Sequence, residues 1–338
     1  MPAIRSCSSL VIRCFKHVEA FADWLTGAAG PWFVAICWSL TLLGGFAFFD
    51  VLVLHQPATL LRAILFPFAG LIAINLYASY YRVTTTDPGN PLVVLDDVRI
   101  HAPWMIRRSS ADEARSGRMR SCGKCGGPKP VRTHHCSVCK RCVLLMDHHC
   151  PWINQCVGLY NIRYFLLFMT WLSLGCWTVV LVGYDSFWQS MNHQAEWQSY
   201  TPPIAFTLIY ILGAAIGIAV PVLLSWHLIL VARGETSIEA HDNDYFANKA
   251  KQQGLRYVNP YDCGWQTNLQ LCFNVGPGRL PYYTLLLPLR YPPASTGWRY
   301  PLHAAATGRD VPGVVVGDDG DELTDDEGGG GGWWVADS

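Results

Sequence analysis

Charged residues are scarce in this chain of 338 residues: Asp, Glu, Lys and Arg together make up only 15%, whereas 51% of the residues are hydrophobic. Soluble globular domains carry about a quarter charged residues, so the composition argues against an ordinary soluble protein. The 25 basic and 25 acidic residues cancel, and no nucleic-acid partner is expected. The scarcity of charge favours an integral membrane protein.

The N-terminal residues lack the pattern of a cleaved signal peptide. Residues 1–30 mix charged residues with short apolar stretches and show no small-residue cleavage pattern, so we expect an uncleaved cytosolic N-terminal segment. The stretch from Val11 to Leu25 has helix-like apolar spacing, which predicts a helix on the bilayer surface or in the cytosol. Residues 317–332 alternate acidic and glycine runs, so 317–338 is expected to be a disordered acidic, glycine-rich tail.

Four apolar windows are long enough to cross the hydrocarbon core of a bilayer, which takes about 20 helical residues. They are residues 31–54, 58–80, 164–183 and 204–231. Asp50, Arg62 and His227 lie near window ends, where such side chains can snorkel to the interface, whereas Asn75 needs a partner helix. The windows predict an α-helical polytopic membrane protein with a bundle of four transmembrane helices.

The orientation follows from the basic residues of the loops, because cytosolic loops carry an excess of Lys and Arg. The loop of residues 184–203 has neither residue type. The stretch between the second and third windows contains many of them, among them Arg82, Arg99, Arg107, Arg108, Arg115, Arg118, Arg120, Lys124, Lys129, Arg132, Lys140 and Arg141. We therefore expect the central stretch and both termini to face the cytosol.

These signals divide the chain into six parts. We expect a cytosolic segment at 1–30, transmembrane helices 1 and 2 within 31–81, a cytosolic cysteine-rich zinc domain at 82–163 with its core at 120–165, transmembrane helices 3 and 4 within 164–231, a cytosolic C-terminal region at 232–316, and the tail at 317–338.

Seven of the thirteen cysteines lie between residues 122 and 156. The pattern is Cys-x2-Cys-x9-His-Cys-x2-Cys-x2-Cys-x4-Asp-His-His-Cys-x5-Cys, and cysteines two residues apart can present two thiolates to one tetrahedral zinc ion. Two four-ligand sites use eight ligands and leave Cys150 without a metal, directly after Asp147, His148 and His149. A spare thiol beside His and Asp is typical of an activated nucleophile.

The cysteine-rich segment resembles the DHHC protein S-acyltransferases, and the match continues through Pro151, Trp152, Asn154, Cys156, Gly158, Asn161 and Phe165. Three further motifs of that family have counterparts, at Asp87-Pro88-Gly89, at Thr236-Ser237-Ile238-Glu239, where Ser replaces the second Thr, and at Asn259-Pro260-Tyr261. The resemblance covers roughly residues 30–270. Within it, Thr133–Cys136 and Arg233–Glu239 most resemble the animal subgroup of the family that is conventionally numbered sixteen.

The resemblance implies two interleaved structural zinc sites, one formed by Cys122, Cys125, His135 and Cys142 and the other by Cys136, Cys139, His149 and Cys156. It also implies that Cys150 attacks a fatty acyl-CoA such as palmitoyl-CoA. His148 would act as general base and Asp147 would orient it. The acyl group would then pass to a cytosolic cysteine of a membrane-associated protein, while the acyl chain stays in the bilayer. Lys129, Arg132 and His134 match positions that face the CoA phosphates in relatives, and Trp152 would cover the first carbons of the acyl chain.

Other interpretations remain open at this point. Cys150 can be an inert buried thiol, His148 a surface residue, Asp147 a turn cap, and the basic residues ordinary solvated side chains. The chain as a whole can also be a membrane-anchored zinc module that binds partners, in the manner of a ubiquitin ligase, or a four-helix channel or transporter with a regulatory zinc fold. A zinc module that only binds partners predicts that every module cysteine binds metal or is inert. A channel or transporter predicts facing pairs of intramembrane ionisable residues.

Overall fold

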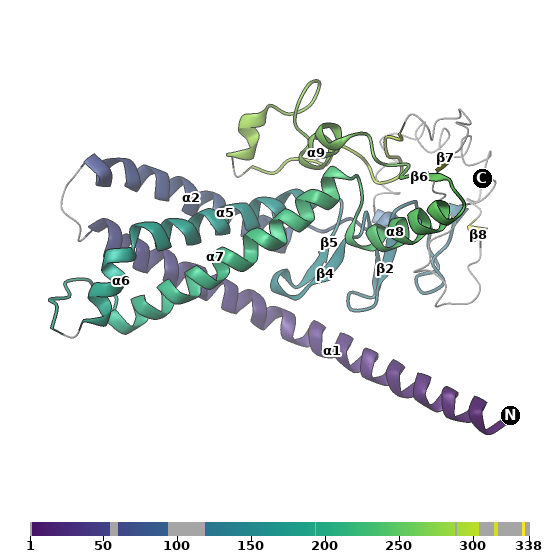
Figure 1. The fold of residues 1–338 in the computed structure, drawn as a ribbon, viewed down its shortest axis with the longest axis horizontal. Helices are drawn as coiled ribbons and strands as arrows, with labels where there is room; N and C mark the ends of the chain where they lie inside the picture. The colour runs from purple at the N-terminus through teal and green to yellow at the C-terminus, as the bar shows by residue number, and fades with distance from the viewer. Residues whose placement is uncertain are drawn as a thin grey trace.

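The computed structural model describes residues 2–54, 60–93, 119–192, 194–287, 289–303, 314–316 and 333–334. Its main body is a bundle of long apolar helices with a small β-rich module at one end (Figure 1). The long helices are α1 (Pro2–Ala47), α2 (Leu60–Thr85), α5 (Ile162–Val182) and α7 (Pro203–Ala232). A π-helical turn, η1 (Phe48–Leu54), extends α1.

Four segments of these helices are long and apolar enough to cross a membrane: Cys14–Leu54, Ala63–Thr85, Ile162–Val182 and Pro203–Ala232. The four predicted spans are therefore confirmed, and the protein is a multi-pass membrane protein. The first helix begins much earlier than the window at residue 31, because the helical spacing of the N-terminal segment runs without a break into the span. Figure 1 shows this N-terminal half of α1 leaving the bundle alone.

Helix α5 lies at the centre of the bundle, between α2 and α7. A short helix, α6 (Tyr184–Met191), joins α5 to α7 at the end far from the β-rich module. There the buried carboxylate of Asp50 in η1 accepts hydrogen bonds from the backbone N–H groups of Tyr200 and Thr201, at 3.3 and 2.6 Å. Asp50 therefore does not snorkel as the sequence predicts; it closes this end of the bundle.

The β-rich module lies between α2 and α5 in the sequence and consists of two antiparallel hairpins. Strands β2 (Thr133–Cys136) and β3 (Arg141–Leu144) form the first, and β4 (His148–Cys150) and β5 (Gln155–Val157) form the second. A 3-10 turn, η2 (Pro151–Ile153), connects β4 to β5 and packs against α1. The module is therefore held directly on the end of the helical bundle.

The C-terminal region folds back over the same end of the bundle (Figure 1). It contains α8 (Ser237–Gln252), α9 (Trp265–Phe273) and the 3-10 turn η3 (Tyr282–Leu285). Its short strands form two pairs. Strand β6 (Arg256–Val258) pairs with β7 (Val314–Val316), and β8 (Trp333–Trp334) pairs with β1 (Met119–Arg120), which precedes the module hairpins. Of the predicted tail, the structure describes only the two residues of β8.

Candidate active site and metal centres

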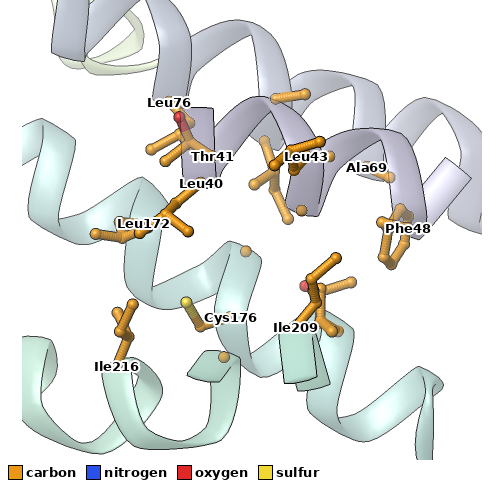
Figure 2. Close-up of a pocket in the computed structure, with 18 of the residues that line it drawn as sticks. Leu40, Thr41, Leu43, Phe48, Ala69, Leu76, Leu172, Cys176, Ile209 and Ile216 are labelled. Carbon is orange, nitrogen blue, oxygen red and sulfur yellow. The ribbon is translucent and has the colours of Figure 1, made fainter. Parts of the chain in front are cut away.

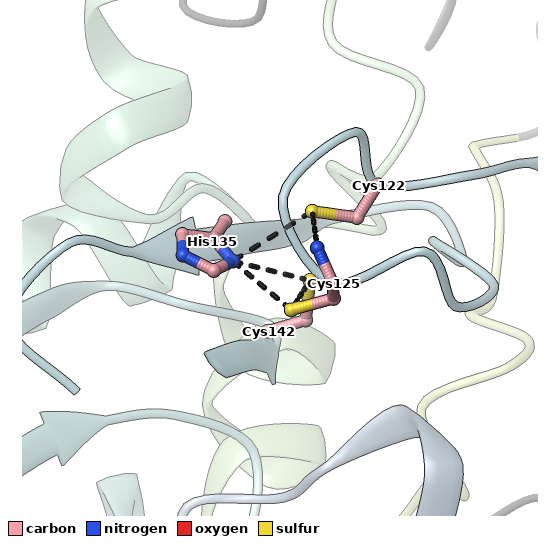
Figure 3. A group of neighbouring side chains, drawn as sticks. All are labelled: Cys122, Cys125, His135 and Cys142. Atoms are coloured by element: carbon pink, nitrogen blue, oxygen red, sulfur yellow. Dashed lines mark hydrogen bonds between the residues drawn. The ribbon is translucent and has the colours of Figure 1, made fainter. Parts of the chain in front are cut away.

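The first group of metal-ligating side chains comprises Cys122, Cys125, His135 and Cys142, whose ligand atoms all lie within 4.8 Å of one another. Figure 3 shows them converging from the 122–125 turn and from the hairpin β2–β3. The His135 Nδ1 atom lies 3.1 Å from Cys125 Sγ and 3.7 Å from Cys122 Sγ. Ligands of one tetrahedral zinc ion, with bonds of about 2.0 to 2.3 Å, stand roughly 3.5 to 3.8 Å apart. The donor set fits a structural zinc ion.

The second group comprises Cys136, Cys139, His149 and Cys156. The His149 Nδ1 atom lies 3.3 Å from Cys139 Sγ and 3.7 Å from both Cys136 Sγ and Cys156 Sγ. His135 and Cys136 are neighbours on β2, so their side chains point to opposite faces of the strand. One hairpin therefore supplies ligands to both groups, which interleave as the resemblance implies.

Cys150 belongs to neither group. It ends β4, is 8% exposed, and belongs to the apolar cluster that contains Tyr80 of α2 and Phe165 of α5. The alternation along β4 sends His149 to the metal group and places His148 on the side of Cys150. The structure thus separates a thiol from the metal centres and sets it where the module meets the membrane helices.

His148 forms a close pair with the buried carboxylate of Asp147, at 2.6 Å from Nδ1 to Oδ2. Burial lowers the pKa of His148, but hydrogen bonds with Asp147 and with Cys150 outweigh that effect and raise its pKa to about 9. Burial likewise raises the pKa of Asp147, but the hydrogen bond from His148 and that from the Ser237 backbone hold it below its usual value. The pair stabilises an imidazolium beside the thiol.

One of the three family motifs outside the module contacts this pair directly. Thr236 and Glu239 form a capping box at the start of α8. Ser237, which follows Thr236, donates hydrogen bonds to Asp147 from its backbone N–H and from its hydroxyl. Asn259 donates to the carbonyl oxygen of Arg233 at 2.9 Å, at the end of α7. The Asp87 to Gly89 turn instead fixes the first hairpin, through an ion pair from Asp87 to Arg141 at 2.5 Å.

The basic residues expected to face CoA phosphates are all buried: Lys129, Arg132 and His134 are 7%, 8% and 6% exposed. Arg132 donates to both carboxylate oxygens of Glu239, at 2.7 and 2.6 Å, and its guanidinium lies over the rings of Tyr261 and Tyr300. A buried guanidinium requires such a bidentate partner. The structure therefore places Arg132 in an internal ion pair, which a separation of 107 residues hides from sequence reasoning.

Trp152 lies at the contact between the module and the first helix. Its ring is half exposed, at 49%, and meets the ring of Phe33 edge-on with centroids 5.0 Å apart. Its carbonyl oxygen accepts a hydrogen bond from the Tyr80 hydroxyl at 2.8 Å. The residue two positions after Cys150 is thus fixed to both α1 and α2.

His227 reaches the site from α7, although the sequence predicts that it snorkels at the end of the fourth window. It is buried, and its Nδ1 atom lies 3.5 Å from Oδ2 of Asp147. Its ring stacks on that of His148, with centroids 5.4 Å apart and planes inclined by 25°. Asp147, His148 and His227 also form a third group of possible ligand atoms, all within 4.8 Å of one another.

An apolar pocket lies within the bundle, between α1, α2, α5 and α7 (Figure 2). Side chains from all four helices line it, among them Leu40, Phe48, Ala69, Leu76, Leu172, Cys176, Ile209 and Ile216. Ile72 and Leu76 belong both to this lining and to the apolar cluster that contains Cys150. The thiol and the pocket therefore share a continuous apolar packing region.

Fold and site together define a class: a multi-pass membrane protein whose Cys/His module fits two zinc ions and holds a separate cysteine beside a His–Asp pair. Residues 115–244 match the family model described as DHHC palmitoyltransferase. The chain belongs to the DHHC family.

Individual relatives agree with this assignment. The chain is 34% identical over 269 residues to palmitoyltransferase ZDHHC16B of Danio rerio, covering 68% of this chain and 65% of that protein. It is 37% identical over 231 residues to palmitoyltransferase ZDHHC16 of Mus musculus, covering 64% and 58%, and 38% identical over 194 residues to palmitoyltransferase pfa3 of Aspergillus fumigatus, covering 56% and 33%. The matched region thus spans less than two thirds of each of these relatives. The two animal proteins carry the number sixteen, the subgroup that Thr133–Cys136 and Arg233–Glu239 predict.

Proposed function

We propose that this protein is a protein S-acyltransferase that moves palmitate or a similar fatty acyl group from acyl-CoA to cysteine thiols of membrane-associated proteins. Cys150 carries the acyl group between the two. The proposal rests above all on one observation: Cys150 is the cysteine of the module that lies outside both metal-ligating groups, and its neighbour His148 is paired with the buried Asp147. The names of the relatives support the same activity.

In the first step, Cys150 gives its proton to His148 and its sulfur attacks the thioester carbonyl carbon of acyl-CoA. The bond from that carbon to the CoA sulfur breaks, the CoA thiol takes the proton, and an acyl-Cys150 thioester remains. In the second step, the substrate cysteine gives its proton to His148 and its sulfur attacks the acyl-Cys150 carbonyl carbon. The bond from that carbon to Cys150 Sγ breaks, and His148 returns the proton to Cys150, so its thiol is regenerated. Each step exchanges one thioester for another and requires no external source of energy. A cysteine thiol with an ordinary pKa of about 8.5 is mostly protonated near neutral pH, so the base is required.

The acyl chain would occupy the apolar pocket. Burying it there, close to the thiol, is worth about 0.8 kcal/mol for each CH₂ group removed from water. The polar CoA part would remain outside the bundle, and contacts of Lys129, Arg132 and His134 with its phosphates stay a prediction. Trp152, next to the thiol and against Phe33, would cover the first carbons of the chain.

The two zinc ions would be held by the two groups of three cysteines and one histidine. Closed tetrahedral sites of this kind contribute folding free energy, of the order of 10 kcal/mol each in favourable peptides, and offer no open position to substrate. Their role here would be to fix the hairpins that carry Cys150. We further propose that the module faces the cytosol of the endoplasmic reticulum or Golgi, where acyl-CoA is supplied and thiols stay reduced.

The two alternatives predict other arrangements. In an interaction module without chemistry, the spare cysteine has no reason to lie beside a paired His and Asp. A transporter would place ionisable residues of its spans opposite one another. Within the described spans, Asp50 instead accepts backbone N–H groups of residues 200 and 201, and Arg163 donates to the carbonyl oxygens of Phe273 and Thr284.

The proposal is tested with full-length protein purified in detergent and incubated with labelled palmitoyl-CoA. Wild-type protein should form a hydroxylamine-sensitive acyl adduct, and Cys150→Ser should form none while retaining two zinc ions per chain. Cys263→Ser, outside the module, is the matched control and should label like the wild type. Hydroxylamine-sensitive self-acylation that persists in Cys150→Ser would rule out the assignment.

A further inference from the structure

His227 lies against both members of the proposed catalytic pair. Its side chain is 9% exposed, and its Nδ1 atom is 3.5 Å from the Asp147 oxygen that His148 also contacts. One face of its ring stacks on His148, and Phe165 of α5 meets each of the two imidazoles at 5.4 Å between centroids. The imidazole of His148 thus contacts Asp147, Phe165 of α5 and His227 of α7, while 32% of its side chain remains exposed.

These contacts bear on the chemistry because the two nitrogens of an imidazole have different tasks. For His148 to exchange a proton with Cys150 in both steps, Nδ1 must stay on Asp147 so that the remaining nitrogen serves the thiol. A single hydrogen bond lets the ring tilt about the bond to the carboxylate. A second ring stacked on its face removes that freedom, and a polar atom of that ring beside the same carboxylate limits movement of Asp147 as well.

We propose that His227 is a positioning residue for acyl transfer: its ring stacks on His148 and its Nδ1 lies beside the Asp147 carboxylate, so that the His148 imidazole stays directed at Cys150. The residue comes from the last membrane helix, and the site is therefore completed by the bundle as well as by the zinc module. The inference rests on the proposed catalytic role of His148 and Cys150.

The test measures how fast iodoacetamide alkylates Cys150, followed by mass spectrometry of the peptide that contains it. This rate reports activation of the thiol and does not depend on acyl-CoA or on a protein substrate. Full-length protein loaded with zinc is compared with five variants, His148→Ala, His227→Phe, His227→Asn, the double variant His148→Ala with His227→Phe, and the control Ser225→Ala. Ser225 is an exposed residue on the same helix.

His227→Phe keeps a ring for stacking but removes the polar atom, so we expect alkylation about three- to tenfold slower, with two zinc ions retained. His227→Asn places an amide nitrogen near the position of Nδ1 but removes the stacked ring, so its rate should lie between those of His227→Phe and the wild type. Because His227 acts through His148, the double variant should be no slower than His148→Ala alone. Ser225→Ala should match the wild type.

The outcomes separate the inference from the proposed function. A normal rate in His148→Ala would overturn the proposed function. A slow His148→Ala together with a normal His227→Phe, or with additive losses in the double variant, would overturn the positioning role alone. Should His227→Phe lose zinc, His227→Asn is compared with His227→Gln, whose amide nitrogen matches Nε2 instead; equal rates for these two would also overturn it.

Discussion

Ser237 donates two hydrogen bonds to Asp147, one from its backbone N–H to Oδ1 at 2.8 Å and one from its hydroxyl to Oδ2 at 3.0 Å. Ser237 is the first residue of α8, whereas Asp147 immediately precedes β4. The start of a helix beyond the last span thus sets the orientation of a carboxylate in the module. This contact gives a physical role to a motif that by sequence alone is only a helix cap.

Changes at Ser237 should therefore have graded effects. Ser237→Ala removes the hydroxyl bond and should slow self-acylation about tenfold or more, since a hydrogen bond to a charged group is worth about 1.5 kcal/mol or somewhat more. Ser237→Pro removes both donors at a position where helices accept proline, and should slow it further. Ser237→Thr keeps both donors and is the control. Equal rates in all three variants would contradict this role of the contact.

Metal content should separate the structural from the catalytic histidines and cysteines. Cys139→Ala removes a thiolate from a closed site and should lower both zinc content and folding, because ligand binding and folding are coupled in such modules. His148→Ala should retain both zinc ions and lose acyl-enzyme formation. Metal analysis and acyl labelling of the two purified variants decide the point. Equal zinc content in both would contradict the ligand assignment.

The buried pair of Arg132 and Glu239 should behave as one unit. Arg132→Met leaves a buried carboxylate and Glu239→Gln leaves a buried guanidinium, so each should destabilise the protein by about 3 kcal/mol or more. The double variant removes both charges and keeps an amide oxygen for the Thr236 cap. Its melting temperature should lie above those of both single variants. A melting temperature lowered by the sum of the two single effects would show that the pair is not coupled.

The pocket predicts which acyl chains are accepted. Gly175 lies in the pocket wall, where an added Cβ would touch Ile72 at 3.5 Å, so the side chain of Gly175→Leu would extend into the pocket. We expect self-acylation to shift from palmitoyl-CoA towards shorter donors. Gly70→Leu on α2, where an added Cβ meets nothing within 4 Å, is the matched control. Unchanged chain-length preference in Gly175→Leu would place the acyl chain elsewhere.

The predicted topology can be checked with engineered glycosylation sites. A site near Gln194, in the loop without Lys or Arg, should be glycosylated because that loop is expected to face the lumen. A site near Ser110, which lies outside the described residues, should not be. Modification near Ser110 would invert the orientation and remove the cytosolic supply of acyl-CoA to Cys150.

The sequence predicts the features that depend on local spacing. The cysteine pairs, the spare Cys150 and the four apolar windows each follow from residues close together in the chain, and the fold confirms the windows and brings the expected donor sets together. The sequence does not predict contacts between residues that are far apart in the chain. The pairing of Arg132 with Glu239 and the approach of His227 to Asp147 depend on how α7 and α8 pack against the module. A lone histidine near the end of an apolar helix gives no sign of the partner it will find.

The hairpin of β2 and β3 carries ligands of both metal-ligating groups on its two faces. An ion lost from one group therefore loosens a strand that the other group needs, so we expect metal uptake to be cooperative, with few molecules holding one ion. When zinc is limiting, a population of such chains would divide into fully loaded and empty molecules. Zinc supply would then regulate how many active enzymes a membrane contains, and leave the turnover of each unchanged.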